Sequence, residues 1–258
     1  MNNINRWLDK VQQTCKQINL DYIDVIIDQC GIQYSVIPAL TDFSPEITWC
    51  SLYKGLPEDI YIEEAPLLVR IEFADAQQVQ WLYSLAKEAS LTAPLLLLGG
   101  KWLFEDVSGW LTGCIDALHE GRPGVFRFWD TRLFSHLISD ILEQHQSQLL
   151  LRPALFWSWM DRDENPVLIV GDGTALNNNN NDVRPKFDLN DSQFEKIMCL
   201  SDAKQYLIHY PLIQQRFSSK EKLFSACFKA MLAATAEGLL FDEKREEWVT
   251  AWLTDKQL

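Results

Sequence analysis

The stretch that decides the fold of the first part of the chain is Val125-Phe126-Arg127-Phe128-Trp129-Asp130-Thr131-Arg132-Leu133-Phe134. Its pattern predicts a short buried strand over 125–129 that leads directly into an amphipathic helix over 131–142. Asp130 suits the N-cap position of that helix, because a carboxylate accepts hydrogen bonds from the first helical amides. Charges set among so many aromatic side chains must be paired or must face a partner.

The charged residues of this stretch have two interpretations, and both stay open. In the first, Arg127, Asp130 and Arg132 form a network of charge-assisted hydrogen bonds that fastens the helix to the strand. Asp130 then offsets the cost of placing a cation in the first turn of the helix. In the second, one arginine is available to anchor the backbone or a carboxylate of a partner. Together with Trp129, these residues are the candidate partner-binding residues.

Outward from this stretch, residues 1–170 alternate between strand and helix patterns. Helices are predicted over 4–18, over 105–118 and from a cap at Asp75 to about residue 89. Strands are predicted over 22–28, 47–53, 66–73 and 94–99, with a hairpin formed by 155–160 and 167–170. This alternation predicts an α/β lobe with a mixed sheet and flanking helices.

The remaining residues have a different pattern. The polar stretch 171–187 contains five consecutive asparagines and cannot pack a core, so it is predicted to be a linker or loop. Residues 188–258 show helical patterns over 191–200, 202–210, 220–237 and 243–253, and Gly238 suits a C′ position. A small all-α lobe is therefore expected at the C-terminal end.

Composition restricts the class of protein. The 258 residues are 47% hydrophobic and carry a formal net charge of −13. An acidic surface repels phosphate groups, which argues against nucleic-acid partners and anionic membranes. The six cysteines include no C-x-x-C pair, the N-terminus has no apolar signal core, and the apolar run 93–100 is too short to span a bilayer. These features predict a soluble, cytoplasmic protein with reduced thiols.

No motif for catalysis stands out. The four histidines lack zinc-binding spacing, Ser135 and His136 point in different directions on one helix, and no G-x-S-x-G elbow occurs. Gly171-Asp172-Gly173-Thr174 lacks the context of a phosphate loop, and the acidic groups 63–64 and 161–164 are better explained as solvated turns. We therefore expect no enzyme activity, no cofactor and no metal. The alternative is a hydrolase or nucleotide-binding enzyme whose site is assembled through space.

The opening stretch resembles the type VI secretion adaptors, effector chaperones in which Phe-Arg-(aromatic)-(aromatic)-Asp-Pro-Arg precedes a Leu-rich helix. Thr131 stands where that family usually has proline. Further segments resemble the family in order: the strand 22–28 that ends in aspartate, the turn Leu52-Tyr53-Lys54-Gly55, the strand that begins Ala65-Pro66 with alanine in place of glycine, and the helix and turn over 230–240.

The resemblance implies a non-enzymatic adaptor. Such a protein binds a toxic secreted effector in the cytoplasm and helps to load it onto the spike protein of the secretion machine. An immunity-type protein that neutralises a toxin is a further alternative.

Overall fold

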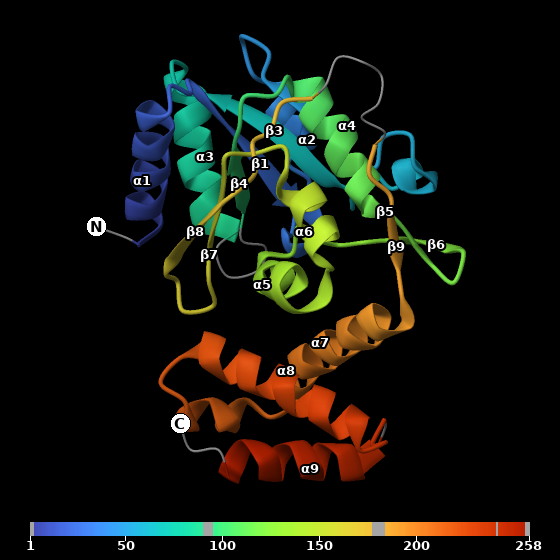
Figure 1. Cartoon of the computed structure of the whole chain (residues 1–258). Helices are drawn as coiled ribbons and strands as arrows, with labels where there is room; N and C mark the ends of the chain where they lie inside the picture. Colours follow the sequence, from blue (N-terminus) through green and yellow to red (C-terminus); the bar gives the residue numbers. More distant parts are fainter. Residues whose placement is uncertain (1–2, 90–94, 177–183, 241, 256–258) are drawn as a thin grey trace. The chain divides into compact units, whose positions relative to one another are not determined.

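The chain forms two compact units, Met1–Asp188 and Leu189–Leu258, in a computed structural model (Figure 1). The structure describes residues 3–89, 95–176, 184–240 and 242–255. The fold class is confirmed: the first unit is α/β and the second is helical. The predicted parts 1–170, 171–187 and 188–258 stay a prediction. Residues 177–183 of the predicted linker, and residue 94 of a predicted strand, lie outside the described residues.

A six-stranded sheet forms the centre of the first unit, with the strand order β2-β3-β1-β4-β7-β8. All five of its strand pairings are antiparallel, whereas the sequence predicted a mixed sheet. The strands are β1 (Tyr22–Asp28), β2 (Thr48–Ser51), β3 (Pro66–Glu72), β4 (Leu96–Gly99), β7 (Phe156–Met160) and β8 (Pro166–Val170). The predicted hairpin is confirmed as β7 and β8.

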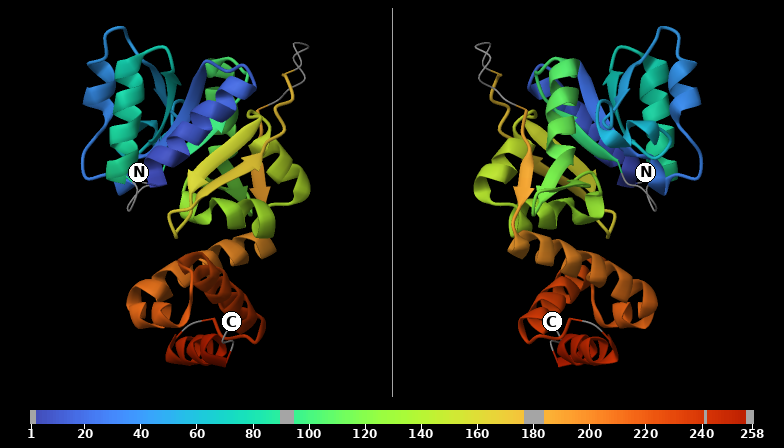
Figure 2. Two further views of the ribbon diagram at one scale, coloured as in Figure 1. Left: turned by 90° about the vertical axis from the view of Figure 1, so that its left-hand side faces the viewer. Right: turned by 90° about the vertical axis from the view of Figure 1, so that its right-hand side faces the viewer.

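Helices cover both faces of this sheet (Figure 2). Trp7 on α1 donates its indole N–H to Ser158 Oγ on β7 at 2.8 Å. Phe134 on α5 packs instead against Trp157 and Trp159, at ring-centroid distances of 5.5 and 5.1 Å. Because side chains alternate along a strand, α1 and α5 lie on opposite faces. The helices of this unit are α1 (Asn3–Gln17), α2 (Ile37–Thr41), α3 (Ala76–Ala89), α4 (Phe104–Ile115), α5 (Thr131–His136) and α6 (Gln144–Leu151).

A smaller sheet has the strand order β6-β5-β9, with β5 (Asp116–His119), β6 (Arg122–Val125) and β9 (Phe187–Leu189). The helix predicted over 105–118 therefore ends earlier, at Ile115. The chain then turns through Glu120 and Gly121, both at positive φ (50° and 74°). Two such residues make the tight turn that a hairpin favours.

The stretch over 125–134 departs from the prediction at two points. Residues 126–130 are not a strand, since β6 ends at Val125 and the amide of Phe128 bonds back to the carbonyl of Phe126 at 2.9 Å. Phe126, Phe128 and Trp129 are all buried, and a strand would send two neighbours to opposite faces. The predicted helix over 131–142 is confirmed only in part, because α5 gives way to a π-helical turn, η3 (Leu137–Ile141).

The second unit contains α7 (Asp191–His209), α8 (Lys220–Ala236) and α9 (Asp242–Asp255). The two helices predicted over 191–200 and 202–210 are one continuous helix. Ser201 and Asp202 disfavour a helix interior only weakly, and the burial of Cys199, Leu200 and Ala203 outweighs that preference. Gly238 adopts φ 77° directly after Glu237, the C-cap of α8, which is the C′ position that was predicted.

Candidate functional site

Segments from four parts of the first unit meet at one end of the central sheet. Asp28 ends β1 and lies opposite Pro66, which begins β3. The turn after β2 joins them, because the amide of Leu52 donates to the carbonyl of Pro66 at 2.9 Å. Arg127 completes the group through its ion pair with Asp28. All four positions belong to segments that resemble the adaptor family.

Arg127 is the accessible partner of the ion pair at this point. Its side chain is 49% exposed, whereas its partner Asp28 is only 5% exposed. Nη2 of Arg127 lies 3.2 Å from Oδ2 of Asp28, and the guanidinium carbon lies 5.6 Å from the ring centre of Trp129. The predicted network is therefore wrong for this residue. Because 126–130 is not a strand, Arg127 extends toward β1 and not toward Asp130.

Asp130 and Arg132 form the local half of the predicted network. Oδ1 of Asp130 accepts hydrogen bonds from the amide and Nε of Arg132, at 3.1 and 2.7 Å, and Oδ2 accepts one from Nη2 at 2.8 Å. Asp130 is thus the N-cap of α5, as predicted. These hydrogen bonds raise the pKa of the Arg132 guanidinium, which keeps the pair charged and holds the helix start in place.

Trp129 is buried, and its ring lies under the guanidinium of Arg127. Its ring packs edge-on against Tyr53 at 6.1 Å and against Phe128 at 5.7 Å. The indole nitrogen is buried and has no hydrogen-bond partner in the described part of the chain. Burial also raises the pKa of Tyr53 to about 12. The exposed residue here is therefore Arg127, and Trp129 supports it from below.

A neighbouring loop adds apolar surface that the sequence reading missed. The side-chain amide of Gln29 donates to the carbonyls of Ile62 and Ala65, at 2.8 and 3.0 Å, and so fixes the loop 57–64 beside Asp28. This loop exposes Ile60 and Tyr61, at 78% and 54%, and also Ile62. In the sequence, the apolar run 60–62 between the acidic pairs 58–59 and 63–64 could have indicated this exposed surface. We call Arg127 and residues 60–62 the Arg127 surface.

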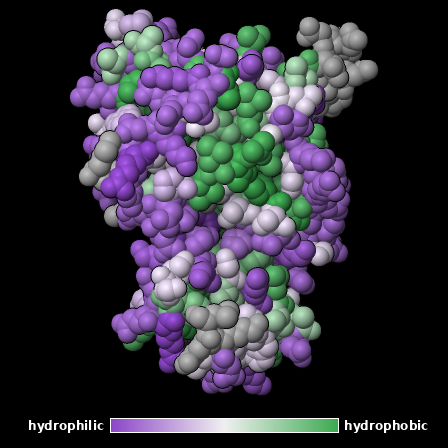
Figure 3. Space-filling view, turned by 60° about the vertical axis from the view of Figure 1, so that its left-hand side comes forward, coloured by the Kyte–Doolittle hydropathy of each residue, from purple (hydrophilic) through white to green (hydrophobic). Residues whose placement is uncertain are grey.

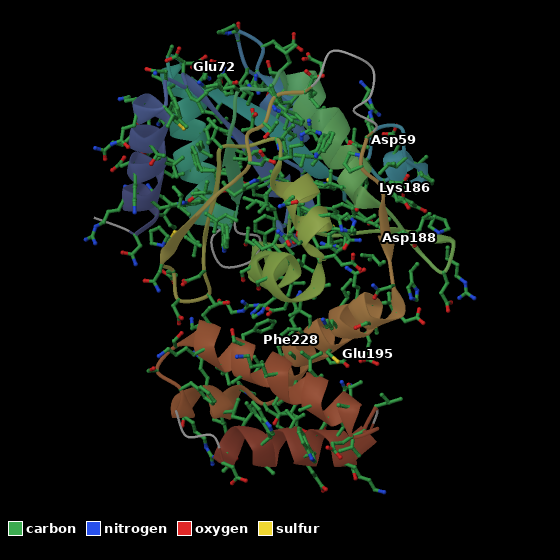
Figure 4. All side chains as sticks on the ribbon, viewed as in Figure 1. Asp59, Glu72, Lys186, Asp188, Glu195 and Phe228 are labelled. Carbon is green, nitrogen blue, oxygen red and sulfur yellow. The ribbon has the colours of Figure 1, made fainter. Side chains whose placement is uncertain are left out.

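Two further contacts hold this loop in place. Oδ2 of Asp59, labelled in Figure 4, accepts a hydrogen bond from the amide of Gly55 at 3.1 Å. The thiol of Cys30 donates to the carbonyl of Glu64 at 3.3 Å. Both contacts join the loop to the segments that carry Asp28 and Leu52, so the exposed residues 60–62 are held at the same end of the sheet as the ion pair of Arg127 with Asp28.

The chemistry of the Arg127 surface suits binding. Part of Cys30 is exposed to solvent. The partial burial of its thiol and the nearby Asp28 carboxylate raise the pKa of that thiol, which opposes formation of a nucleophilic thiolate. The arginines are engaged by carboxylates, and an exposed cation beside apolar side chains can contact a polypeptide partner. Within the described residues, no group of three metal-binding side chains is present.

The other segments weighed in the sequence form ordinary turns. Asp161 accepts hydrogen bonds from the amides of Asp163 and Asn165, at 2.9 and 2.7 Å, in the turn of the β7–β8 hairpin. Asp172 accepts a hydrogen bond from the amide of Thr174 at 3.2 Å. None of the helices in the described ranges is long and apolar enough to cross a membrane.

Comparison with known proteins finds a match to a family model. Residues 25–148 match the model of a family described as a domain of unknown function, DUF4123. The matched residues begin within β1 and end within α6, so they include Asp28, the loop 57–64 and Arg127. Neither a curated protein nor a solved structure matches the chain.

Proposed function

We propose that this chain is a cytoplasmic adaptor, without a catalytic step of its own, that binds a type VI secretion effector and brings it to the spike protein. The observation that carries the proposal is the convergence of the family-like segments on the Arg127 surface. Four segments separated in sequence hold an accessible arginine at the end of the sheet where the loop 57–64 also exposes apolar side chains. The family match over residues 25–148 supports it, because it covers this entire surface.

The Arg127 surface has the features of a binding site for a polypeptide. Arginine and tyrosine are enriched among residues that dominate binding energy. Asp28 and Trp129 hold the arginine in one position, which lowers the entropy lost when a partner binds. We therefore propose Arg127 as a direct contact to the effector, positioned by Asp28 and Trp129, while Asp130 and Arg132 fix the start of the helix that follows.

The test is co-expression with the product of the adjacent gene, as the candidate effector, and separately with the spike protein, followed by co-purification. We expect a stable complex with the effector that remains exportable by the secretion machine. An effector that binds but is permanently neutralised would support the immunity-type alternative instead. Failure of both proteins to co-purify would overturn the adaptor proposal.

A matched pair of variants tests the role of Arg127. Arg127→Ala is expected to weaken effector binding by about tenfold or more, as for a central interface arginine. Arg122→Ala, which removes an exposed arginine of β6, is the control and is expected to bind normally. Because Arg127→Ala leaves the buried Asp28 carboxylate without its cation, the melting temperature should also fall, so binding is compared well below the unfolding transition of the variant. Normal binding by Arg127→Ala would exclude Arg127 as a contact.

A further inference from the structure

The free edge of the central sheet is a second surface with specific chemistry. β8 is the last strand in the order β2-β3-β1-β4-β7-β8, and its sequence is Pro-Val-Leu-Ile-Val. Along β8, the side chains of Leu168 and Val170 are 39% and 80% exposed. Figure 3 looks at this side of the first unit and shows hydrophobic surface bordered by hydrophilic surface.

The hydrogen bonds of β8 show which backbone groups face outward. At the two ends of the β7–β8 ladder, the amide of Asp161 donates to Asn165 and the amide of Gly171 donates to Leu155, both at 2.9 Å. Because bonded pairs alternate in an antiparallel ladder, Val167 and Ile169 bond to β7. The N–H and C=O groups of Leu168 and Val170 therefore point away from the sheet. Among the described residues, no hydrogen bond reaches them.

The geometry points to strand addition: we propose that β8 binds an extended segment of another polypeptide, apolar at alternate positions and flanked by lysine or arginine. An added strand is the structure that satisfies a row of outward amides and carbonyls. Pro166 has no N–H group, so it limits the pairing at one end. This surface lies at the opposite edge of the sheet from β2, and the proposal is independent of the adaptor role.

Charge selects the kind of strand that fits. The turn before β8 carries Asp161, Asp163 and Glu164 beside a single cation, Arg162, which donates to the carbonyl of Arg132, and Asp172 follows the strand. A second copy of this chain, paired antiparallel about Leu168, would place its Asp172 opposite Glu164. Two such contacts between chains that each carry a net charge of −13 are repulsive. Basic residues at both ends of a partner strand would meet these carboxylates favourably.

A groove at the end of the strand offers room for a side chain of the partner. It has a volume of about 540 Å³ and is lined in part by Ile138, Leu142, Leu151 and Val170. Ser139, Gln144, Ser147, Gln148 and Asp172 also line it, so its mixed walls suit a long amphipathic side chain, such as that of a flanking lysine.

The experiment uses the full chain and a seven-residue peptide with valine at alternate positions, threonine between them and lysine at both ends. Amide hydrogen exchange, followed residue by residue by NMR, is the main measurement. We expect the peptide to slow exchange of the Leu168 and Val170 amides by about tenfold or more, while the Val167 and Ile169 amides, already bonded to β7, change little.

Two control peptides test the chemistry. In the first control peptide, the amides that would donate to the outward carbonyls of β8 are N-methylated. This peptide should bind about tenfold more weakly, because it loses those backbone hydrogen bonds. A version with glutamate at both ends should also bind more weakly, and the difference should shrink in high salt.

Variants of the chain test the same groups from the other side. Val170→Pro removes one outward N–H and no ladder hydrogen bond, whereas Val170→Thr keeps that group and is the matched control. Peptide binding should be lost only in the proline variant. If that variant fails to fold, the N-methylated peptide and the wild-type chain decide the question.

Three results would overturn the proposal. One is a lysine-flanked peptide that leaves both outward amides unprotected at millimolar concentration. Another is equal binding of the N-methylated peptide. The last is protection of the two amides without peptide that increases with protein concentration, since that result would assign the edge to a second copy of the chain.

Discussion

At the scale of single residues, two arginines five positions apart take different roles. Arg132 pairs with Asp130, two residues away, and the pair fixes the start of α5. Arg127 pairs with Asp28, 99 positions away in sequence, and stays half exposed. The same residue type therefore stabilises local structure in one case and presents a charge to solvent in the other.

The reactivity of the Cys30 thiol depends on the ion pair of Arg127 with Asp28. Burial and Asp28 raise the pKa of its thiol, and Arg127 lowers it. Arg127→Ala should therefore raise the pKa further, reduce the thiolate fraction at pH 8 and slow alkylation by iodoacetamide by roughly threefold. The measurement is the labelling rate of Cys30 in the native protein by mass spectrometry.

Two control variants should change the labelling rate of Cys30 differently from Arg127→Ala. Asp28→Asn removes a charge that raises the pKa, so it should speed the labelling, and Arg122→Ala should leave the rate unchanged. Faster labelling in Arg127→Ala would contradict the described electrostatics. Cys15 and Cys114 are fully buried, which raises the pKa of both thiols, and they should stay unlabelled.

At the scale of elements, β1 and β3 carry an ion pair inside the sheet. Asp24 and Arg70 are direct partners in the strand register, and two hydrogen bonds of 2.7 and 2.8 Å join their side chains. The guanidinium also stacks on the ring of Tyr22 at 3.8 Å. This pair places two opposite charges in the middle of strands whose other charged residues, Asp28 and Glu72, lie at strand ends. The cost of burial is offset only while both partners are present.

Removing one partner should be costly and dependent on pH. Arg70→Leu leaves the buried Asp24 carboxylate without its cation and should lower the free energy of unfolding by about 3 kcal/mol at pH 7. Burial already raises the pKa of Asp24, and the loss of Arg70 raises it further. The folded variant then holds its proton to higher pH than the unfolded chain, so its deficit should grow as pH rises from about 4 to 7.

Urea unfolding across this pH range measures the effect. The double variant Asp24→Leu with Arg70→Leu is the control, and it should recover most of the lost stability because no charge remains buried. A deficit in Arg70→Leu that stays constant between pH 4 and 7 would contradict the assignment.

The two glycines of α4 give a second test at this scale. A Cβ on Gly113 would lie 2.5 Å from the carbonyl oxygen of Pro185, whereas one on Gly109 would meet the end of the Arg184 side chain at 3.0 Å. The glycines therefore let the segment 184–185 approach the helix, which continues through both of them.

Alanine substitutions should separate these two positions. Gly113→Ala must displace backbone and should lower the free energy of unfolding by about 1–3 kcal/mol. Gly109→Ala needs only a shift of a flexible side chain and gains helix propensity, so it should be neutral or stabilising by up to about 1 kcal/mol. Thermal unfolding compares them, and equal losses would contradict the described contacts.

At the scale of the whole molecule, the central sheet separates two surfaces. The Arg127 surface lies where β1 ends and β3 begins, and the free edge lies three strands from β1, at β8. One offers a cation with apolar neighbours, and the other offers backbone hydrogen bonds. A partner bound at one therefore does not have to occupy the other.

The helical unit has an apolar core of its own. Leu223, Phe224, Cys227 and Phe228 are buried along α8, and Val249 and Leu253 are buried on α9. Residues 189–258 made alone should therefore give a helical circular dichroism spectrum and a cooperative thermal transition. Phe224→Asp is the control, because a charge in this core should abolish the transition. A gradual loss of signal in the unsubstituted fragment would show that the unit needs the rest of the chain.

Features that depend on neighbouring residues could be predicted from the sequence. The alternation of apolar patterns predicted β1, β3, α1 and the β7–β8 hairpin, because the period of burial belongs to each element. The caps at Asp130 and Gly238 were predictable for the same reason, since a cap bonds to groups a few residues away.

Features that depend on the packing of distant segments were not readable. The sheet is antiparallel throughout, residues 126–130 are not a strand, and Arg127 turns to Asp28. Each outcome depends on which strand lies beside which, and no local pattern contains that information. The exposed loop over 60–62 shows the same limit, because its place beside Arg127 depends on hydrogen bonds from Gln29 across the fold. The sequence thus identifies Asp28 and Arg127 as charged residues in apolar segments. That they form an ion pair at one end of the sheet follows from the strand order.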